Sequence, residues 1–408
     1  MESNTQLKEM IRSMVIDVLQ GQKQEAASSQ PFKQAPRGQV EPGVFDTVDE
    51  AIQAAKAAQA RFEDCTLATR EKVIADIRAA MRPRVQELAQ KTVEETGMGR
   101  VADKVLKLNL TLDKTPGVED LVTECETGDN GMTLYELSAY GVIGAITPST
   151  NPAETLICNT IGMLAAGNAV FFSVHPGAKH LSRLLVSELN QIIAKSIGIE
   201  NLIVTLREPS IESAQEMMLH PDVSLLVVTG GPGVVKQALQ SGKKVIGAGA
   251  GNPPAFVDET ADIKKAAQDI VLGASLDNNI LCIAEKSVVA MRQIEPQLIQ
   301  EMVKAGCVLV ENQQDIQRLV DLTVLPNGTP NKKFVGKNAS VILDAAHIPY
   351  NGDPRLIIMR APKNHPFAVI EMLMPILPVV TVDSFEEGLD VCLMLEAGLH
   401  HTATMHSL

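Results

Sequence analysis

The chain has 408 residues, of which 45% are hydrophobic and 21% charged, so we expect a large buried core divided over two or three globular domains. A formal net charge of -13 without a cluster of Lys or Arg argues against nucleic acid or an anionic membrane as partner and favours small-molecule chemistry. Six cysteines without a CxxC pair or a repeated spacing indicate neither a disulfide framework nor a zinc site, and they favour a reducing compartment such as the cytosol.

The first 20 residues are predicted to form an amphipathic helix. Its apolar face carries Leu7, Met10, Ile11, Met14, Val15, Val18 and Leu19. Residues 21–42 are rich in Gln, Ser, Ala and Pro and predict a flexible linker. A helix on such a tether favours a docking peptide, with a helix packed on the main body as the alternative. Charges of both signs on its polar face disfavour membrane binding, and charged residues also interrupt any signal peptide.

Residues 43–248 alternate between predicted helices and strands. Helices at 48–61 and 70–96 precede the turn Gly128-Asp129-Asn130-Gly131 and a strand at 132–137. Five further strands are predicted at 141–146, 169–173, 202–206, 223–228 and 243–246, with helices at 152–166, 178–196 and 211–218. This alternation predicts a mostly parallel sheet that binds ligands at the carboxyl ends of its strands.

The uncharged stretch 155–174 is long enough to span a membrane. However, Gly162, Gly167 and Asn168 divide it into a helix and a strand. A membrane span is therefore not expected here.

A second lobe is predicted to begin near Gly251. A helix at 262–274, the polar turn Asp277-Asn278-Asn279 and a strand at 287–291 mark its start. Cys282 directly follows this polar turn, where a thiol can be presented to a cleft, so it is the candidate nucleophile. The other thiols are interpreted as packing or incidental residues: Cys65, Cys125, Cys158, Cys307 and Cys392.

Two loops that connect a strand to a helix are candidate binding sites. In the loop 147–152, Asn151 is placed to cap the helix, and its position at the end of a strand also allows side-chain donors there to bind an oxyanion. Thr229, Gly230 and Gly231 can direct backbone amides at a pyrophosphate, although such glycines are also common for steric reasons. The glycine-rich run 247–251 precedes a strand, not a helix, and is interpreted as close packing.

Histidines near the end of the chain form a further cluster. His400, His401 and His406 do not have the spacing of a metal site on a helix, so no metal is predicted. Polar packing or the lining of a substrate cleft is the preferred interpretation.

Several motifs occur together in a specific order. They are Pro148-Ser149-Thr150-Asn151-Pro152, Ala165-Ala166-Gly167-Asn168, His175-Pro176, Thr229-Gly230-Gly231, Gly249-Ala250-Gly251-Asn252-Pro253-Pro254, Asn278-Asn279 through Cys282, and Met374-Pro375-Ile376-Leu377-Pro378. In this order, over residues 43–408, the chain resembles the aldehyde dehydrogenase superfamily, specifically the coenzyme A-acylating branch of bacterial microcompartments. It is most similar to the enzymes that act on propionaldehyde in propanediol utilisation, with the acetaldehyde enzymes of ethanolamine utilisation second.

The resemblance implies an α/β fold with a Rossmann-type NAD-binding domain at residues 43–248 and an α/β catalytic domain at 249–408. Cys282 matches the thiol nucleophile of the family. Thr150 and Asn151 lie in the loop that faces the hemithioacetal oxygen, and an extra residue there leaves open which of them matches the usual Asn. Residues that match the cofactor site are His175 near the ribose, Thr229, Gly230 and Gly231 near the pyrophosphate, and Glu371 near the nicotinamide ribose.

One departure from hydrolytic members of the superfamily concerns the general base for water. The segment that usually reads Glu-Leu-Gly-Gly here reads Gly247-Ala248-Gly249-Ala250-Gly251. A thioester on Cys282 would then react with a thiol such as coenzyme A, which needs less activation than water. The predicted reaction is oxidation of a short-chain aldehyde, preferably propanal, to acyl-coenzyme A with NAD. Acetaldehyde is the alternative substrate, and hydrolysis to the free acid is the rival reaction.

The resemblance also concerns partners and location. Similar N-terminal helices look like encapsulation peptides, so residues 1–20 are expected to bind a shell protein inside a microcompartment of the bacterial cytoplasm. A strand at about 128–138 resembles an oligomerisation segment, which implies a homo-oligomer. Relatives continue well past Leu408, so we expect the catalytic domain to be C-terminally incomplete. A truncated cofactor-binding or shell-binding module without turnover is the remaining alternative.

Overall fold

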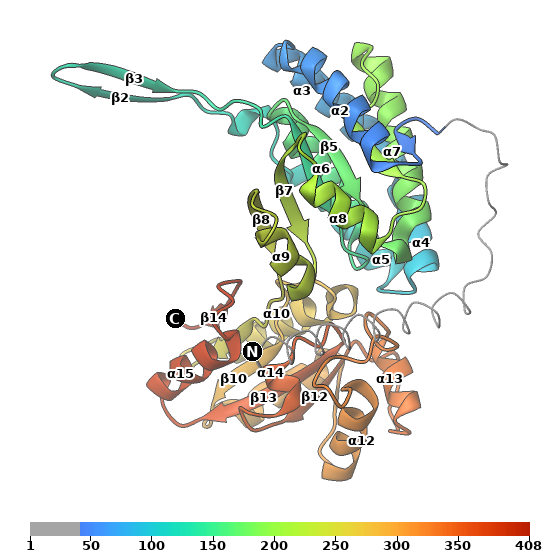
Figure 1. Cartoon of the computed structure of the whole chain (residues 1–408). Coiled ribbons are helices and arrows are strands. Elements are labelled where there is room, and N and C mark those ends of the chain that lie inside the picture. The colour runs from blue at the N-terminus through green and yellow to red at the C-terminus, as the bar shows by residue number, and fades with distance from the viewer. Residues whose placement is uncertain (1–40) are drawn as a thin grey trace, which may run out of the picture. The chain divides into compact units, whose positions relative to one another are not determined.

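The computed structural model describes residues 41–408, in which two six-stranded sheets and one two-stranded hairpin are found (Figure 1). Helices alternate with strands along both six-stranded sheets, which confirms the predicted α/β class. The predicted helix at residues 1–20 and most of the predicted linker at 21–42 lie outside the described residues.

The first six-stranded sheet is entirely parallel. Its strands, in spatial order, are β1 (Val44–Phe45), β6 (Ile203–Leu206), β5 (Ala169–Ser173), β4 (Val142–Ile146), β7 (Val223–Thr229) and β8 (Lys244–Ala248). The central strands β4 and β5 are apolar and almost fully buried, as expected when helices cover both faces of a sheet. From β4 the chain first adds strands on one side and later returns to add β7 on the other. A topological switch point therefore lies between β4 and β7.

The helices of residues 48–239 share one hydrophobic core with this sheet. They are α2 (Val48–Glu63), α3 (Leu67–Met81), α4 (Val85–Thr96), α5 (Val101–Lys114), α6 (Pro152–Ala165), α7 (Lys179–Ile197), α8 (Ile211–Leu219) and α9 (Pro232–Leu239). The continuous helix predicted at 70–96 is wrong, because the short 3-10 helix η1 (Arg82–Arg84) separates α3 from α4. Pro83 explains the break, since it has no amide hydrogen with which to continue the helix.

Helix α5 was not among the predicted elements. Its apolar side is carried by Val101, Val105, Leu108 and Leu112, a helical spacing that contributes to the first core. Charged residues interrupt this pattern in the sequence and obscure it. The structure shows that three of them, Asp103, Lys104 and Lys107, are buried.

The predicted turn at Asp129 and Asn130 joins the antiparallel strands β2 (Glu124–Gly128) and β3 (Gly131–Tyr135). Figure 1 shows this hairpin extending away from the helices and the sheet. Every residue of both strands is exposed, including the apolar side chains of Met132 and Leu134. The oligomerisation role of residues 128–138 stays a prediction.

The second six-stranded sheet is also parallel. Its strands, in spatial order, are β11 (Cys307–Leu309), β12 (Leu356–Arg360), β13 (Ile376–Val382), β10 (Ser287–Met291), β9 (Pro254–Val257) and β14 (Thr404–His406). Its helices are α10 (Ile263–Ser275), α11 (Glu295–Lys304), α12 (Gln313–Thr323), α13 (Ala339–Ala345), α14 (Pro366–Val369) and α15 (Phe385–Glu396). Two hydrophobic clusters form the core of this lobe. The chain passes from the first sheet to the second between residues 248 and 254.

The uncharged stretch 155–174 contributes most of α6 and the whole of β5. Gly167 lies in the turn between them with φ 80°, a left-handed conformation that favours glycine. Among residues 41–408, no helix combines the length and the apolar character needed to cross a bilayer.

Candidate active site

Three loops that carry predicted site residues leave the same edge of the first sheet. Asn151 follows β4, His175 follows β5, and Gly230 follows β7. The three strands are adjacent and parallel, so their carboxyl ends meet at the switch point between β4 and β7. Sheets of this type bind ligands at such a point.

The loop after β4 holds Asn151 by its side chain. Asn151 occupies the cap position before α6 and Pro152 the first helical position, as predicted, but the Asn151 side chain makes no capping hydrogen bond. Instead its Oδ1 accepts a hydrogen bond from Lys107 Nζ, and its Nδ2 donates to Thr150 Oγ1 at 3.3 Å. The side-chain amide of Asn151 is therefore engaged by Lys107 and Thr150 and does not cap α6.

The turn before Cys282 has an unusual backbone. Asp277, Asn278 and Asn279 all lie in the left-handed region, with φ 49°, 57° and 64°. Asp and Asn enter this region more readily than other residues with side chains, but normally singly, so three in succession store strain. All three are buried, which means that the surrounding structure must hold the turn in place.

Side-chain hydrogen bonds hold the two asparagines of this turn. Asn278 Nδ2 donates to Gly336 O at 2.8 Å, while Asn278 Oδ1 accepts from Arg100 Nε at 3.1 Å. Asn279 Nδ2 donates to Ala274 O at 2.7 Å. The turn is thereby fixed to three separate segments of the chain.

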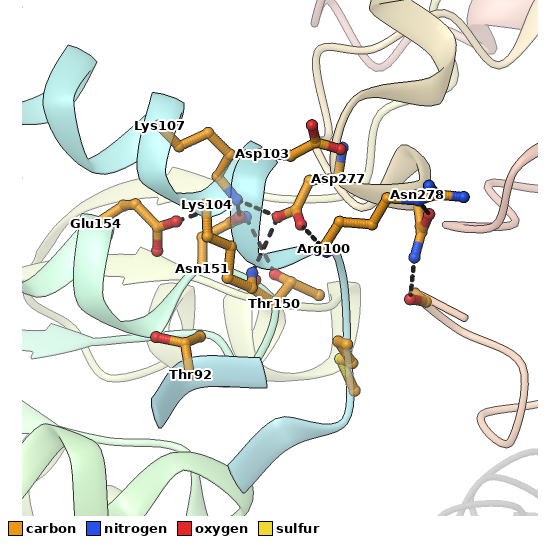
Figure 2. Close-up of polar contacts among 12 residues, drawn as sticks. Thr92, Arg100, Asp103, Lys104, Lys107, Thr150, Asn151, Glu154, Asp277 and Asn278 are labelled. Carbon is orange, nitrogen blue, oxygen red and sulfur yellow. Dashed lines mark hydrogen bonds and ion pairs between the residues drawn. The ribbon is translucent and has the colours of Figure 1, made fainter. Parts of the chain in front are cut away.

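Asp277 is held by two lysines of α5, as Figure 2 shows. Lys104 Nζ lies 2.9 Å and Lys107 Nζ 2.5 Å from Asp277 Oδ2. The other carboxylate oxygen, Oδ1, accepts a hydrogen bond from the backbone N–H of Arg100 at 2.9 Å. Burial disfavours the Asp277 carboxylate, but the two ammonium groups outweigh it and lower the pKa of this carboxyl.

The two lysines also reach the loop after β4. Lys104 Nζ donates to Thr150 O in this loop at 3.2 Å. Lys107 Nζ lies 3.2 Å from Glu154 Oε1 in the first turn of α6, directly after the loop. Burial and the neighbouring Lys107 lower the pKa of Lys104. For Lys107, the nearby carboxylates of Glu154 and Asp277 outweigh burial and raise the pKa. The cluster contains two cations and two anions and is electrically balanced.

These lysines were missed because charged residues in a helical pattern normally face solvent. A signal was present: Arg100, Asp103, Lys104 and Lys107 follow one another at offsets of three, one and three positions, which places them along one helical side. All four bind the turn or the segment near it, since Asp103 Oδ2 accepts from the backbone N–H of Asp277 at 2.9 Å.

Cys282 lies partly buried near two ionisable residues. Burial, together with the carboxylate of Glu371, raises the pKa of the Cys282 thiol, and the ammonium of Lys286 acts in the opposite direction. Glu371 Oε1 accepts a hydrogen bond from the backbone N–H of Gly251 at 3.2 Å. Burial also raises the pKa of Glu371. Burial and the Glu371 carboxylate thus both favour the protonated Cys282 thiol over its thiolate.

Lys286 supports the turn that carries Cys282. Its ammonium is buried and donates to Asn279 O at 2.9 Å, to Asn279 Oδ1 at 2.6 Å and to Leu281 O at 2.7 Å. Burial lowers the pKa of Lys286 to about 8. Lys286 was not predicted from the sequence as a site residue, although it lies four residues after Cys282.

A cavity of about 530 Å³ is lined by α9, by residues 247–250 and by Leu399, His400 and His401. The next residue of the glycine-rich run, Gly251, lies close to Cys282, since a Cβ there would lie 2.8 Å from Cys282 O and 2.8 Å from the His401 ring. Close packing is thus confirmed at Gly251. The prediction of close packing is wrong at Gly249, where a Cβ would meet no atom within 4 Å. His400 and His401 agree with the predicted lining of a cleft.

The N-terminus of α9 can hold a phosphate group at this cavity. Gly231 is the cap residue of this helix and has no side chain with which to cap it, and Pro232 at the first helical position has no amide hydrogen, so the first amide hydrogens offered to another acceptor are those of Gly233 and Val234. A Cβ at Gly231 or Gly233 would meet nothing within 4 Å, which leaves the approach to these amides open. Gly230 is tied to the glycine-rich run, because its N–H donates to Ala248 O at 3.2 Å.

His175 is exposed at the start of the 3-10 helix η3 (Pro176–Ala178), where its Nδ1 accepts a hydrogen bond from Gly177 N at 3.0 Å. It shares the sheet edge with the other loops.

Among the remaining thiols, burial raises the pKa of Cys307 to about 12 and that of Cys392 to about 11. Cys158 lies on an exposed side of α6, so its place in an apolar helix does not bury it. In residues 41–408, no cluster of His, Cys, Asp or Glu can hold a metal ion.

Comparison with known proteins gives consistent matches along the chain. The model of the aldehyde dehydrogenase family matches residues 18–404. A CoA-propanoylating propanal dehydrogenase of Salmonella typhimurium is 50% identical over 366 residues, which cover 90% of this chain and 78% of the relative. An acetylating acetaldehyde dehydrogenase of the same organism is 45% identical over 373 residues, which cover 90% of this chain and 79% of the relative.

Solved structures give the same result. The propionaldehyde dehydrogenase of Rhodopseudomonas palustris, with bound CoA and an acylated cysteine, has a TM-score of 0.88 and 47% identity and covers 90% of this chain and 84% of its own. A propionaldehyde dehydrogenase from the Clostridium phytofermentans fucose utilisation microcompartment has a TM-score of 0.87 and 46% identity, with the same coverage of 90% and 84%.

Proposed function

Because this chain belongs to the aldehyde dehydrogenase family, we propose that it oxidises a short-chain aldehyde, preferably propanal, to acyl-coenzyme A with NAD, through a thioester on Cys282. The observation that carries this proposal is the position of Cys282, whose backbone packs against Gly251 at the end of the glycine-rich run that lines the cavity. Glu371, which binds Gly251, lies beside the same thiol.

In this reaction the thiolate of Cys282 adds to the aldehyde carbonyl, forming a C–S bond and leaving an oxyanion. Asn151 Nδ2 is the proposed donor to that oxygen, since Asn151 Oδ1 already accepts from Lys107, and Thr150 orients the amide through its hydroxyl. Loss of a hydride from the same carbon then gives the thioester. The thiolate of coenzyme A attacks the thioester, releases acyl-coenzyme A and restores Cys282.

NAD supplies the hydride acceptor when it is bound. The cavity beside α9 fits a dinucleotide, because open amides at the helix N-terminus and glycines along one wall leave room for a pyrophosphate. In the proposed assignment Thr229, Gly230 and Gly231 form the loop that lies against the pyrophosphate, with Gly230 held by its bond to Ala248 O, while Glu371 and His175 bind the two riboses.

Release to coenzyme A rather than to water is supported by Gly247. Hydrolytic relatives carry the water-activating Glu at this position of the motif. Gly247 lies in β8 and lines the cavity, and it has no side chain that can accept a proton from water. Hydrolysis of the thioester therefore lacks a general base at this position, and attack by the thiol of coenzyme A is favoured.

The product decides this proposal. Purified protein incubated with NAD, propanal and coenzyme A is expected to form one propionyl-coenzyme A for each NADH, measured by mass spectrometry and absorbance. Propionate formed without coenzyme A would contradict the proposal, and absence of any product would support a module without turnover. Acetaldehyde is the second candidate substrate because an acetylating relative is 45% identical. A higher kcat/KM for acetaldehyde than for propanal would reverse the ranking.

We also propose that residues 1–20 dock the enzyme on a shell protein inside a bacterial microcompartment, and that the exposed β2–β3 hairpin pairs with further copies of the chain. The apolar stripe of residues 1–20 and the microcompartment source of one solved relative support docking. Residues 1–20 fused to a fluorescent protein are expected to form puncta only when shell proteins are co-expressed. Diffuse fluorescence under both conditions would exclude encapsulation by this segment.

A further inference from the structure

Lys107 joins the two halves of the candidate site. Its ammonium donates to the side chain of Asn151 after β4 and lies 2.5 Å from Asp277 Oδ2 in the turn before Cys282 (Figure 2). We propose that Lys107 is a positioning residue, which holds the Asn151 amide with its Nδ2 directed at the oxygen of the bound aldehyde. This role rests on the function proposed above, because it acts on the oxyanion of that reaction.

The chemistry of the ammonium determines the orientation of the amide. A lysine ammonium donates hydrogen bonds and accepts none, so the Asn151 atom that faces it must be the oxygen Oδ1. The Nδ2 group then lies on the other branch of the amide, where one hydrogen is donated to Thr150 Oγ1. The second N–H hydrogen of Nδ2 is left for the substrate oxygen. An amide turned the other way would present an acceptor to an oxyanion and oppose the reaction.

Burial makes this orientation firm. Lys107 is 7% exposed and Asp277 is fully buried, so water cannot replace the contact between them. Glu154 on α6 lies 3.2 Å from the same ammonium. With one carboxylate on each of two elements, Lys107 is held between α6 and the turn before Cys282. It can therefore transmit the position of that turn to Asn151.

Lys104 provides a matched comparison. It lies on the same helix, is also buried, and binds the same Asp277 Oδ2 at 2.9 Å. Its contact with the loop after β4 is to the backbone oxygen of Thr150 instead of to the Asn151 amide. A role that is merely structural predicts similar effects for the two lysines. A positioning role through Asn151 predicts that Lys107 alone is coupled to that side chain.

The test is a double-mutant cycle on the first turnover. The rate of NADH formation is measured with propanal and NAD, without coenzyme A, for Lys107→Met, Lys104→Met, Asn151→Ala and both double variants. Lys107→Met is expected to slow this rate at least about tenfold in the unaltered background and less than about twofold in the Asn151→Ala background. Lys104→Met is expected to have the same effect in both backgrounds.

Alkylation of Cys282 by iodoacetamide supplies a second readout, because it requires the thiolate but no oxyanion donor. Its rate is expected to stay within about twofold in Lys107→Met. Equal losses in both backgrounds, or a parallel loss of alkylation, would overturn the positioning role. If Lys107→Met yields no folded protein, the same rates are compared between Glu154→Gln and the double variant Glu154→Gln/Lys107→Met. The double variant keeps the buried cluster neutral, because it leaves one ammonium, Lys104, opposite one carboxylate, Asp277.

The outcomes also separate this role from the proposed function. An unaltered protein that forms no NADH with propanal contradicts the proposed function. An unaltered protein with a normal first turnover, combined with additive losses in the cycle, contradicts only the role of Lys107.

Discussion

Replacement of Cys282 by alanine is expected to lower propanal-dependent NADH formation by about 10⁴-fold or more. The thiol forms the bond from which hydride leaves, and no neighbouring group can replace it, since Lys286 uses its ammonium in three hydrogen bonds to the turn. The rate is measured by absorbance at saturating NAD and propanal, with NAD binding followed separately by isothermal titration calorimetry.

Cys158→Ala is the control for this experiment, because Cys158 is an exposed thiol that has no part in the proposed site. Its activity is expected to stay within about twofold of the unaltered protein. Loss of activity in Cys158→Ala together with substantial activity in Cys282→Ala would refute the assignment of the nucleophile. Unchanged NAD binding in Cys282→Ala shows that the loss is chemical.

Replacement of Asp277 by alanine is expected to lower the free energy of unfolding by about 3–5 kcal/mol, because it leaves two buried lysines with one carboxylate between them. A further cost of about 1–2 kcal/mol comes from the backbone, because alanine is disfavoured at the φ of 49° found here. Urea unfolding followed by circular dichroism and by fluorescence measures the change in midpoint.

Two variants identify the source of that loss. Asp353→Ala also removes a carboxylate, one that pairs with Arg100, the residue directly before α5. The Asp353 side chain is 71% exposed, so the free energy of unfolding is expected to fall by less than about 1 kcal/mol. Asp277→Asn removes the charge and keeps a residue that tolerates the left-handed region. Equal midpoints for Asp277→Ala and Asp353→Ala would show that the buried cluster does not stabilise the fold.

The pattern of strands and helices was largely readable from the sequence. Strands β5 and β10 begin and end at the predicted residues, because each is a continuous apolar run with polar or glycine boundaries. The helix predicted at 70–96 fails at Pro83, where a single missing amide hydrogen outweighs an otherwise helical pattern.

The candidate site was only partly predictable. Cys282 was identified from the polar turn before it, and the structure adds that this turn is buried and left-handed at all three residues. Lys286 and Lys107 were not predicted as site residues, because charged side chains normally face solvent, and the helical spacing of residues 100–107 does not by itself show that this side is buried. Asp277, the partner of Lys107, lies 170 positions away in the chain, whereas the hydrogen-bond partners of Lys286, Asn279 and Leu281, lie seven and five residues before it.

The sequence by itself therefore determined the α/β alternation, the mostly parallel character of the first sheet and the choice of Cys282 as candidate nucleophile, since these follow from local hydrophobic spacing and from short motifs. Only the tertiary structure decided which charges leave solvent. Packing of α5 against the turn at Asp277 buries Lys104 and Lys107. A charged helical side that would be expected in solvent thereby forms a buried ion cluster with Asp277. The physical reason is that burial and charge pairing depend on residues about 170 positions apart, which local spacing does not encode.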